Sequence, residues 1–133
     1  TYAVSRREGW RAALAEAGIE AEPGLHRHGR MSEGEGLLAA VALWGPGGLR
    51  PTGVVCGSAR LASGLLCGLG ALGLRVPADV SVVVHDDELP GLRPAAFDPP
   101  LTATRSALAE SWPHLARLLV EAVDGAPAAT LQI

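Results

Sequence analysis

The sequence predicts an α/β fold with an open, mostly parallel sheet flanked by helices. Two observations lead to this prediction. Helix signals alternate along the chain with short, continuous apolar runs, which is the pattern of parallel β/α units with right-handed crossovers. The chain has 133 residues, of which 48% are hydrophobic, so its length and composition suit one globular domain with a sizeable core.

Helix starts are marked by capping boxes, in which Ser is followed three residues later by Glu. Ser5 to Glu8 predicts a helix that begins at Ser5 and stops at Gly18. Ser32 to Glu35 predicts a second helix, which continues to Trp44 and ends at the breaker Gly45–Pro51. A weaker strand is expected between them, from Leu25 to Arg30.

The second half of the chain predicts three more strands and two more helices. The strands are expected at 52–57, 80–85 and 101–104, and the helices at 58–72 and from Ser106 to about Val123. Gly64, Gly68 and Gly70 lie inside the first of these helices and each costs about 1 kcal/mol relative to Ala. Close packing of its backbone against a neighbour would explain them. Pro113 is expected to bend the last helix.

Composition excludes several classes of function. The net charge is −3 and all 11 cationic residues are Arg, without the basic stripe that follows nucleic-acid phosphates. The longest apolar stretch, 61–74, is too short to span a bilayer. Cys56 and Cys67 form no CxxC motif, and we expect two buried thiols in a reducing cytoplasm. The helix signal at the very start indicates that an upstream part is missing.

Polar residues follow the predicted strands, where parallel sheets bind their ligands. Arg30 or Met31 follows the first strand, Gly57 and Ser58 the second, and His85 and Asp86 the third. Arg6 and Arg7 join this edge if a strand precedes the first helix. An Arg with an Asp suits a polyhydroxylated or heterocyclic ligand, because the carboxylate accepts hydrogen bonds and the guanidinium donates them in a fork.

Other kinds of site fit the sequence less well. A phospho-acceptor receiver domain would carry the pair Asp86–Asp87 near its start and a lysine on a later strand, and the chain has no lysine. His26 and His28 lack a third metal ligand nearby, so we expect them to be exposed at a sheet edge. A triad of Ser58, His85 and Asp86 fails because neighbours on a strand point to opposite faces. We therefore expect no catalytic residue, no metal and no cofactor.

Three stretches together resemble the effector-binding domain of lactose/galactose-repressor (LacI/GalR) type transcription regulators. They are SRREGWRAALAEAGIE, GLRVPADVSVVVHDD and PPLTATR, in this order and at matching spacing. The resemblance implies an incomplete lobe of the periplasmic-binding-protein-like (type I) fold. It assigns 1–98 to the C-terminal lobe, without its first elements, and 99–133 to a crossover strand and helix of the N-terminal lobe.

The resemblance also implies ligand contacts. Arg6 falls on the Arg of the family's Arg-x-x-Gly-Trp motif and Asp86 on the first acid of its aromatic-Asp-Asp motif, where His85 replaces the aromatic. Met31 falls near a position that often carries a stacking aromatic. Ser58-Ala59 replaces the usual Asn-Asp, and Ser cannot match the reach of the amide.

The function implied is small-molecule binding and dimerisation within a DNA-binding regulator. The effector would be a sugar, a nucleobase or a related polar metabolite, and DNA would be bound only by a helix-turn-helix in the missing N-terminal part. Dimers of the family pair through this lobe, which would also account for the glycine-rich helix at 58–72. Packing of that helix inside the chain is the alternative. A solute-binding protein of a transporter and a small α/β enzyme are the competing interpretations.

Overall fold

The computed structural model describes residues 2–86, 89–105 and 108–125. Its sheet has the order β1-β2-β3 and all its pairs are parallel. Strand β1 spans Gly53–Cys56, β2 spans Ser81–Asp86 and β3 spans Thr102–Arg105. The predicted parallel α/β fold is confirmed, and each of these strands lies within one residue of its predicted position.

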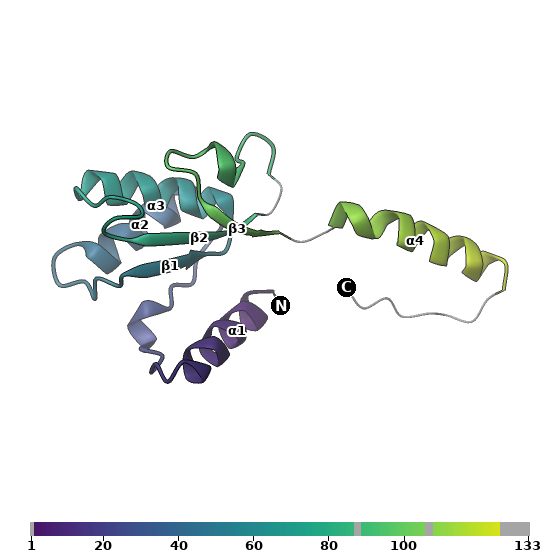
Figure 1. Ribbon diagram of the computed structural model, residues 1–133, viewed down its shortest axis with the longest axis horizontal. Helices are drawn as coiled ribbons and strands as arrows, with labels where there is room; N and C mark the ends of the chain where they lie inside the picture. The colour runs from purple at the N-terminus through teal and green to yellow at the C-terminus, as the bar shows by residue number, and fades with distance from the viewer. Residues whose placement is uncertain (1, 87–88, 106–107, 126–133) are drawn as a thin grey trace.

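Two helices cover one face of the sheet (Figure 1). They are α2 (Glu33–Trp44) and α3 (Ala59–Ala71). Ser32 caps α2 by accepting a hydrogen bond from the Glu35 N–H at 3.2 Å, as the capping box predicts. The core lies between these helices and the sheet, and its largest fully buried apolar side chains are Leu65, Leu69, Val80 and Val84.

The glycines of α3 allow it to pack closely on α2. A Cβ at Gly64 would overlap the Glu33 carbonyl, and one at Gly68 would lie 2.5 Å from the Ala40 Cβ. Close packing is thus confirmed for these two glycines, and it occurs inside the chain. Nothing lies within 4 Å of a Cβ at Gly70, so packing does not explain that glycine.

Helix α1 (Tyr2–Glu16) starts earlier than predicted. Ser5 is therefore inside the helix and the expectation that it forms the N-cap is wrong, because three helical residues precede it. The helix ends before Gly18, which has a φ of +69°, as its glycine signal predicts. Figure 1 shows α1 on the side of β1 that faces away from α3.

The strand predicted at 25–30 is absent from the described residues. Pro23–Leu25 forms a 3-10 helix, and the chain after it is extended at His26 without pairing to a strand. A strand needs a hydrogen-bonded neighbour, and the space beside this segment is a cavity. His26 was expected to be exposed but is half-buried. Both cysteines were expected to be buried; Cys56 is buried, but Cys67 is exposed on α3.

Helix α4 (Leu108–Val123) contains Pro113 and lies apart from the sheet (Figure 1). Its range agrees with the prediction, although Ser106 is outside the described residues. Within those residues, no helix is long and apolar enough to cross a membrane.

Candidate functional site

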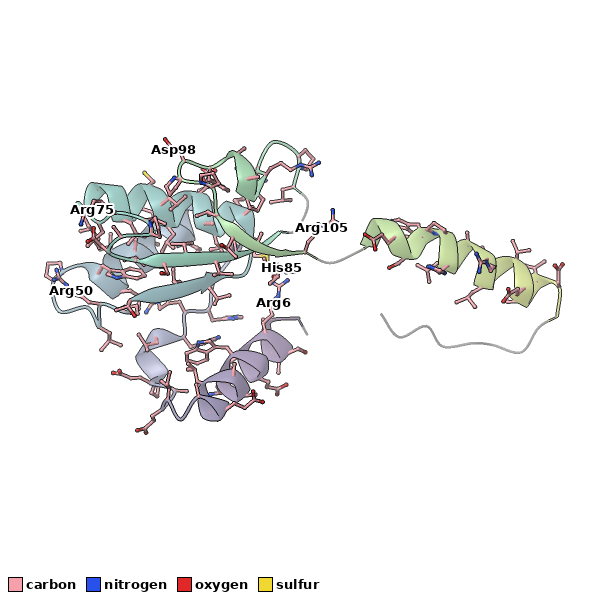
Figure 2. The ribbon with its side chains drawn as sticks, in the orientation of Figure 1. Arg6, Arg50, Arg75, His85, Asp98 and Arg105 are labelled. Atoms are coloured by element: carbon pink, nitrogen blue, oxygen red, sulfur yellow. The ribbon has the colours of Figure 1, made fainter. Side chains whose placement is uncertain are left out.

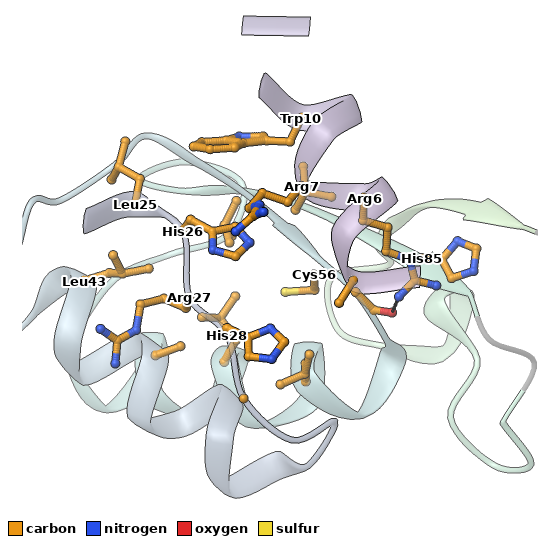
Figure 3. Close-up of a pocket in the computed structure, with 18 of the residues that line it drawn as sticks. Arg6, Arg7, Trp10, Leu25, His26, Arg27, His28, Leu43, Cys56 and His85 are labelled. Carbon is orange, nitrogen blue, oxygen red and sulfur yellow. Dashed lines mark hydrogen bonds between the residues drawn. The ribbon is translucent and has the colours of Figure 1, made fainter. Parts of the chain in front are cut away.

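A cavity of about 580 Å³ lies between α1, the segment 25–31 and the sheet (Figure 3). Its walls are mostly apolar, and Arg6, His85 and Thr104 form a polar end of the cavity where the strands finish. Other polar lining residues lie on α1, on α2 and in the segment 20–30. Parallel sheets bind ligands at the carboxyl ends of their strands because loops and helix starts converge there. The polar end of the cavity is therefore the candidate site.

Arg6 is the cation at this end. It comes from α1, and its Nη1 donates a hydrogen bond of 2.8 Å to the Gly57 carbonyl directly after β1. The side chain is half-buried and lines the cavity. One hydrogen bond uses one of the five N–H donors of a guanidinium, so Arg6 keeps donors for a ligand oxygen.

His85 and Thr104 form a polar pair beside Arg6. They are partners in the register of β2 and β3, and the His85 Nδ1 lies 3.2 Å from the Thr104 Oγ1. Both line the cavity, and Figures 2 and 3 show His85 near Arg6. Thr104 was not predicted as a site residue. Its only signal was its place in PPLTATR, within the strand expected at 101–104.

The acids that follow His85 are only partly described. Strand β2 ends at Asp86, which is the register partner of Arg105, so its backbone is at the same edge as His85. The structure does not describe the Asp86 side chain, and Asp87 lies outside the described residues. Ligand binding by Asp86 stays a prediction.

Ser58 and Met31 differ in their access to the site. Ser58 is fully buried and caps α3, its Oγ accepting a hydrogen bond from the Leu61 N–H at 3.3 Å. It is not part of the cavity wall, whereas Met31 is part of it and is 52% exposed. The structure therefore brings Arg6, Met31 and His85 to one cavity and leaves the Ser58 hydroxyl occupied in a helix cap.

The opposite wall of the cavity carries a histidine next to an aromatic ring. The ring centroids of His26 and Trp10 are 6.1 Å apart. Burial lowers the pKa of His26 below its usual value of 6.5, and the positive charges of Arg7, His28 and Arg11 lower it further. These neighbouring cations therefore disfavour the protonated form of His26.

Cys56 lines the cavity where β1 ends. Burial raises the pKa of its thiol to about 12, which keeps it protonated and unreactive at neutral pH. The described residues contain no group of three or more His, Cys, Asp or Glu that could hold a metal ion.

Comparison with known proteins agrees with this architecture. The family model of the periplasmic-binding-protein-like domain matches residues 1–133. The HTH-type transcriptional regulator AglR of Rhizobium meliloti is 36% identical over 121 residues, which cover 90% of this chain and 33% of AglR.

Solved structures give the same result. The transcriptional regulator CelR, solved as a complex with cellobiose, is 31% identical with a TM-score of 0.77 over 92% of this chain and 36% of CelR. A LacI-family regulatory protein from Chloroflexus aggregans has a TM-score of 0.82 and 26% identity over 92% of this chain and 43% of its own.

The chain spans about one third of AglR and of CelR, so it corresponds to only part of these regulators. The relatives described here are transcription regulators and not enzymes. The family model matches this chain over residues 1–133, and the fold is similar to that of a LacI-family regulatory protein. The chain therefore belongs to the periplasmic-binding-protein-like domain family and forms part of the effector-binding domain of a LacI-family transcription regulator.

Proposed function

We propose that the polar end of the cavity binds a polyhydroxylated small molecule, of the size of a mono- or disaccharide. One observation carries this proposal: the Arg6 guanidinium is fixed by the Gly57 carbonyl beside the His85–Thr104 pair. These groups offer N–H donors and hydroxyl or imidazole acceptors at one place, and sugar hydroxyls both donate and accept. The cellobiose complex of CelR supports the same ligand class.

In this proposal, some of the predicted residues contact the ligand directly and one of them, Ser58, acts indirectly. Arg6 donates to a ligand oxygen, and His85 and Asp86 stand at the end of β2, where the ligand lies. Met31, in the segment 25–31 that lines the cavity, contacts an apolar ring face of the ligand. The Ser58 hydroxyl acts indirectly, because it holds the first turn of α3 at the end of β1.

The parent protein then works as a switch. Ligand binding favours one arrangement of two lobes, and a homodimer transmits this arrangement to DNA-binding helix-turn-helix modules outside this chain. The shift can be no larger than the difference in ligand affinity between the two states. Because the relatives regulate transcription, we place the protein in the cytoplasm and favour this function over that of a solute-binding protein.

The division between lobes belongs to the same proposal. Residues 1–98 would form the larger part of one lobe, and 99–133 would lead into the other. The exposed apolar face of α4 supports a partner lobe for that helix. Strand β3 pairs with β2 in the sheet described here, so the crossover would follow β3.

The test is a ligand titration of the Arg6→Ala variant. Cellobiose is the first probe in a panel of mono- and disaccharides, with binding measured by calorimetry. A charge-assisted hydrogen bond contributes about 1.5–3 kcal/mol, so we expect the affinity for the sugar that binds to fall by about 10- to 150-fold.

The matched control is Arg11→Ala, because Arg11 is also on α1 and does not line the cavity. Its affinity should equal that of the unchanged chain. Equal weakening in both variants would point to a general charge effect and would contradict the proposed contact. Failure of every sugar in the panel to bind would contradict the ligand class.

A further inference from the structure

His85 and Thr104 lie in one row across the sheet with the carbonyl that anchors Arg6. They are register partners on β2 and β3, and the His85 Nδ1 is 3.2 Å from the Thr104 Oγ1. Continued by one residue, the register of β1 and β2 places Gly57 on the other side of His85. Neighbouring strands are about 4.8 Å apart, so the three strands bring these groups together.

This row lies on the face of the sheet that is turned away from α2 and α3. Val84, which precedes His85 on β2, is fully buried in the core between the sheet and these helices. Adjacent side chains on a strand point to opposite faces, so the His85 side chain is directed to the cavity. His85 is half-buried and Thr104 is exposed, and both line the cavity, so a small molecule can reach the pair.

The contact with Thr104 orients the imidazole ring of His85. It occupies Nδ1 on the side of β3, so the ring edge that carries Nε2 is turned toward β1. Arg6 is on that side, because its guanidinium donates to the Gly57 carbonyl at 2.8 Å, and Figure 3 shows it beside the His85 ring. Nε2 is therefore the ring nitrogen that a molecule next to Arg6 would meet.

The same arrangement decides which nitrogen of the neutral ring carries the proton. A guanidinium is positively charged and has only N–H donors, so it favours a lone pair, and not an N–H group, on the nearby Nε2. The state of one ring nitrogen is set by the hydrogen bond that the other makes. The proton is therefore on Nδ1, which donates to the hydroxyl oxygen of Thr104.

We propose that Thr104 is a positioning residue that holds His85 as a hydrogen-bond acceptor at Nε2. Together with the donors of Arg6, this acceptor selects a ligand hydroxyl that donates one hydrogen bond and accepts another. A ligand oxygen that only accepts, such as an ether or carbonyl oxygen, would leave Nε2 unpaired. The selection of ligands rests on the proposed function, whereas the tautomer of His85 does not depend on any ligand.

The first experiment determines this tautomer by long-range ¹H–¹⁵N NMR of the imidazole rings. Spectra are recorded at about pH 8.5, where free imidazole side chains are neutral. We expect His85 to show a protonated Nδ1 and an unprotonated Nε2. His28 is exposed and should show the average of both tautomers, which provides the reference in the same spectrum.

Three substitutions on β3 test the role of the hydroxyl. Thr104→Val should shift the His85 resonances toward the averaged pattern, and Thr104→Ser, which keeps the hydroxyl, should retain the original pattern. Thr102→Val is the matched control, because Thr102 is exposed on the same strand and does not line the cavity. It should leave the His85 resonances unchanged.

The second experiment measures cellobiose binding by calorimetry. Thr104→Val should weaken binding about two- to tenfold, the effect of one neutral hydrogen bond, whereas Thr102→Val should not change it. In a chain that also carries His85→Phe, Thr104→Val should have no further effect, because Thr104 acts through His85.

Different outcomes would overturn different parts of the inference. A proton on Nε2 of His85, or a tautomer that Thr104→Val leaves unchanged, would overturn the positioning role. The same loss of affinity from Thr104→Val with and without His85 would show that Thr104 does not act through the imidazole. If the tautomer is as expected but cellobiose and the other sugars of the panel fail to bind, the proposed function fails and the positioning of His85 stands.

Discussion

At the scale of single residues, the site depends on groups whose chemistry is set by burial. Cys56 and Cys67 have similar sequence contexts, but one ends β1 facing the core and the other is exposed on α3. Sequence could not separate them, because both lie in apolar runs. The structure separates them by their surroundings, and this difference can be measured.

The two thiols should react at very different rates with a thiol reagent such as DTNB at pH 8. The pKa of Cys56 rises from 9.0 to about 12, which leaves it roughly a thousandfold less thiolate than an unperturbed thiol. We expect one fast equivalent per chain, lost in Cys67→Ser and kept in Cys56→Ser. A fast phase that survives Cys67→Ser would show that the wall at Cys56 opens readily.

His26 should make the stability of the chain fall on mild acidification. Its pKa in the folded state is below 6.5 because of burial and then of Arg7, His28 and Arg11. The unfolded chain therefore binds the proton more tightly, so stability is full above about pH 6.5 and falls as the pH drops through that value toward the folded pKa.

The measurement for His26 is the urea midpoint at pH 7.5 and pH 5.5. His26→Gln should reduce the difference between the two midpoints, whereas His28→Gln, on the same segment but exposed, should reduce it less. An equal effect of both variants would assign the pH dependence to the general charge of this wall.

At the scale of elements, local rules predicted most of the fold. The cap at Ser32 and the strands at 53–56 and 81–86 follow from residues close in sequence, through side-chain-to-backbone bonds and continuous apolar runs. Two predictions were wrong for physical reasons. Ser5 became an interior residue because helix propensity continues upstream, and 25–30 stayed unpaired because a strand depends on a neighbour that local sequence does not contain.

The candidate site was predictable to the same extent. The structure brings Arg6, Met31 and His85 to one cavity. The strand-end rule accounts only for His85, because Met31 was expected after a strand that is absent and Arg6 lies on α1. The rule also placed Ser58 at that edge, yet helix capping takes its hydroxyl. Thr104 was missed because it becomes part of the site only through the register of β2 and β3, which no local pattern specifies.

Two Gly→Ala substitutions on α3 should change the free energy of unfolding in opposite directions, because only one of the two glycines lies in the contact with α2. At Gly64 a methyl group meets the Glu33 backbone, and overpacking of this kind costs about 1–3 kcal/mol. At Gly70 there is open space, so Ala should stabilise the helix by about 0.5–1 kcal/mol. Urea unfolding gives both values, and a neutral Gly64→Ala would mean that the two helices are not in close contact.

At the scale of the whole molecule, the chain is a folded sheet unit plus a helix with an exposed apolar face. Trp112, Leu115, Leu119 and Val123 recur at helical spacing on α4 and are 66%, 41%, 67% and 79% exposed. Contiguous apolar surface of this kind marks an interaction site. In the proposed parent protein the second lobe would cover this face, and in the chain by itself we expect another copy to cover it.

The chain by itself should therefore self-associate through α4. Sedimentation velocity between about 5 and 200 µM should show a rising average mass, since apolar burial drives association.

Leu119→Glu with Val123→Glu should keep the chain monomeric while leaving its urea midpoint unchanged, because α4 lies apart from the sheet and its core (Figure 1). Glu substitutions at His114 and Arg117, which are exposed polar positions of the same helix, are the control and should leave association in place. A wild-type chain that stays monomeric throughout this range would show that the α4 face is covered within the molecule, and would argue against a second lobe as its partner.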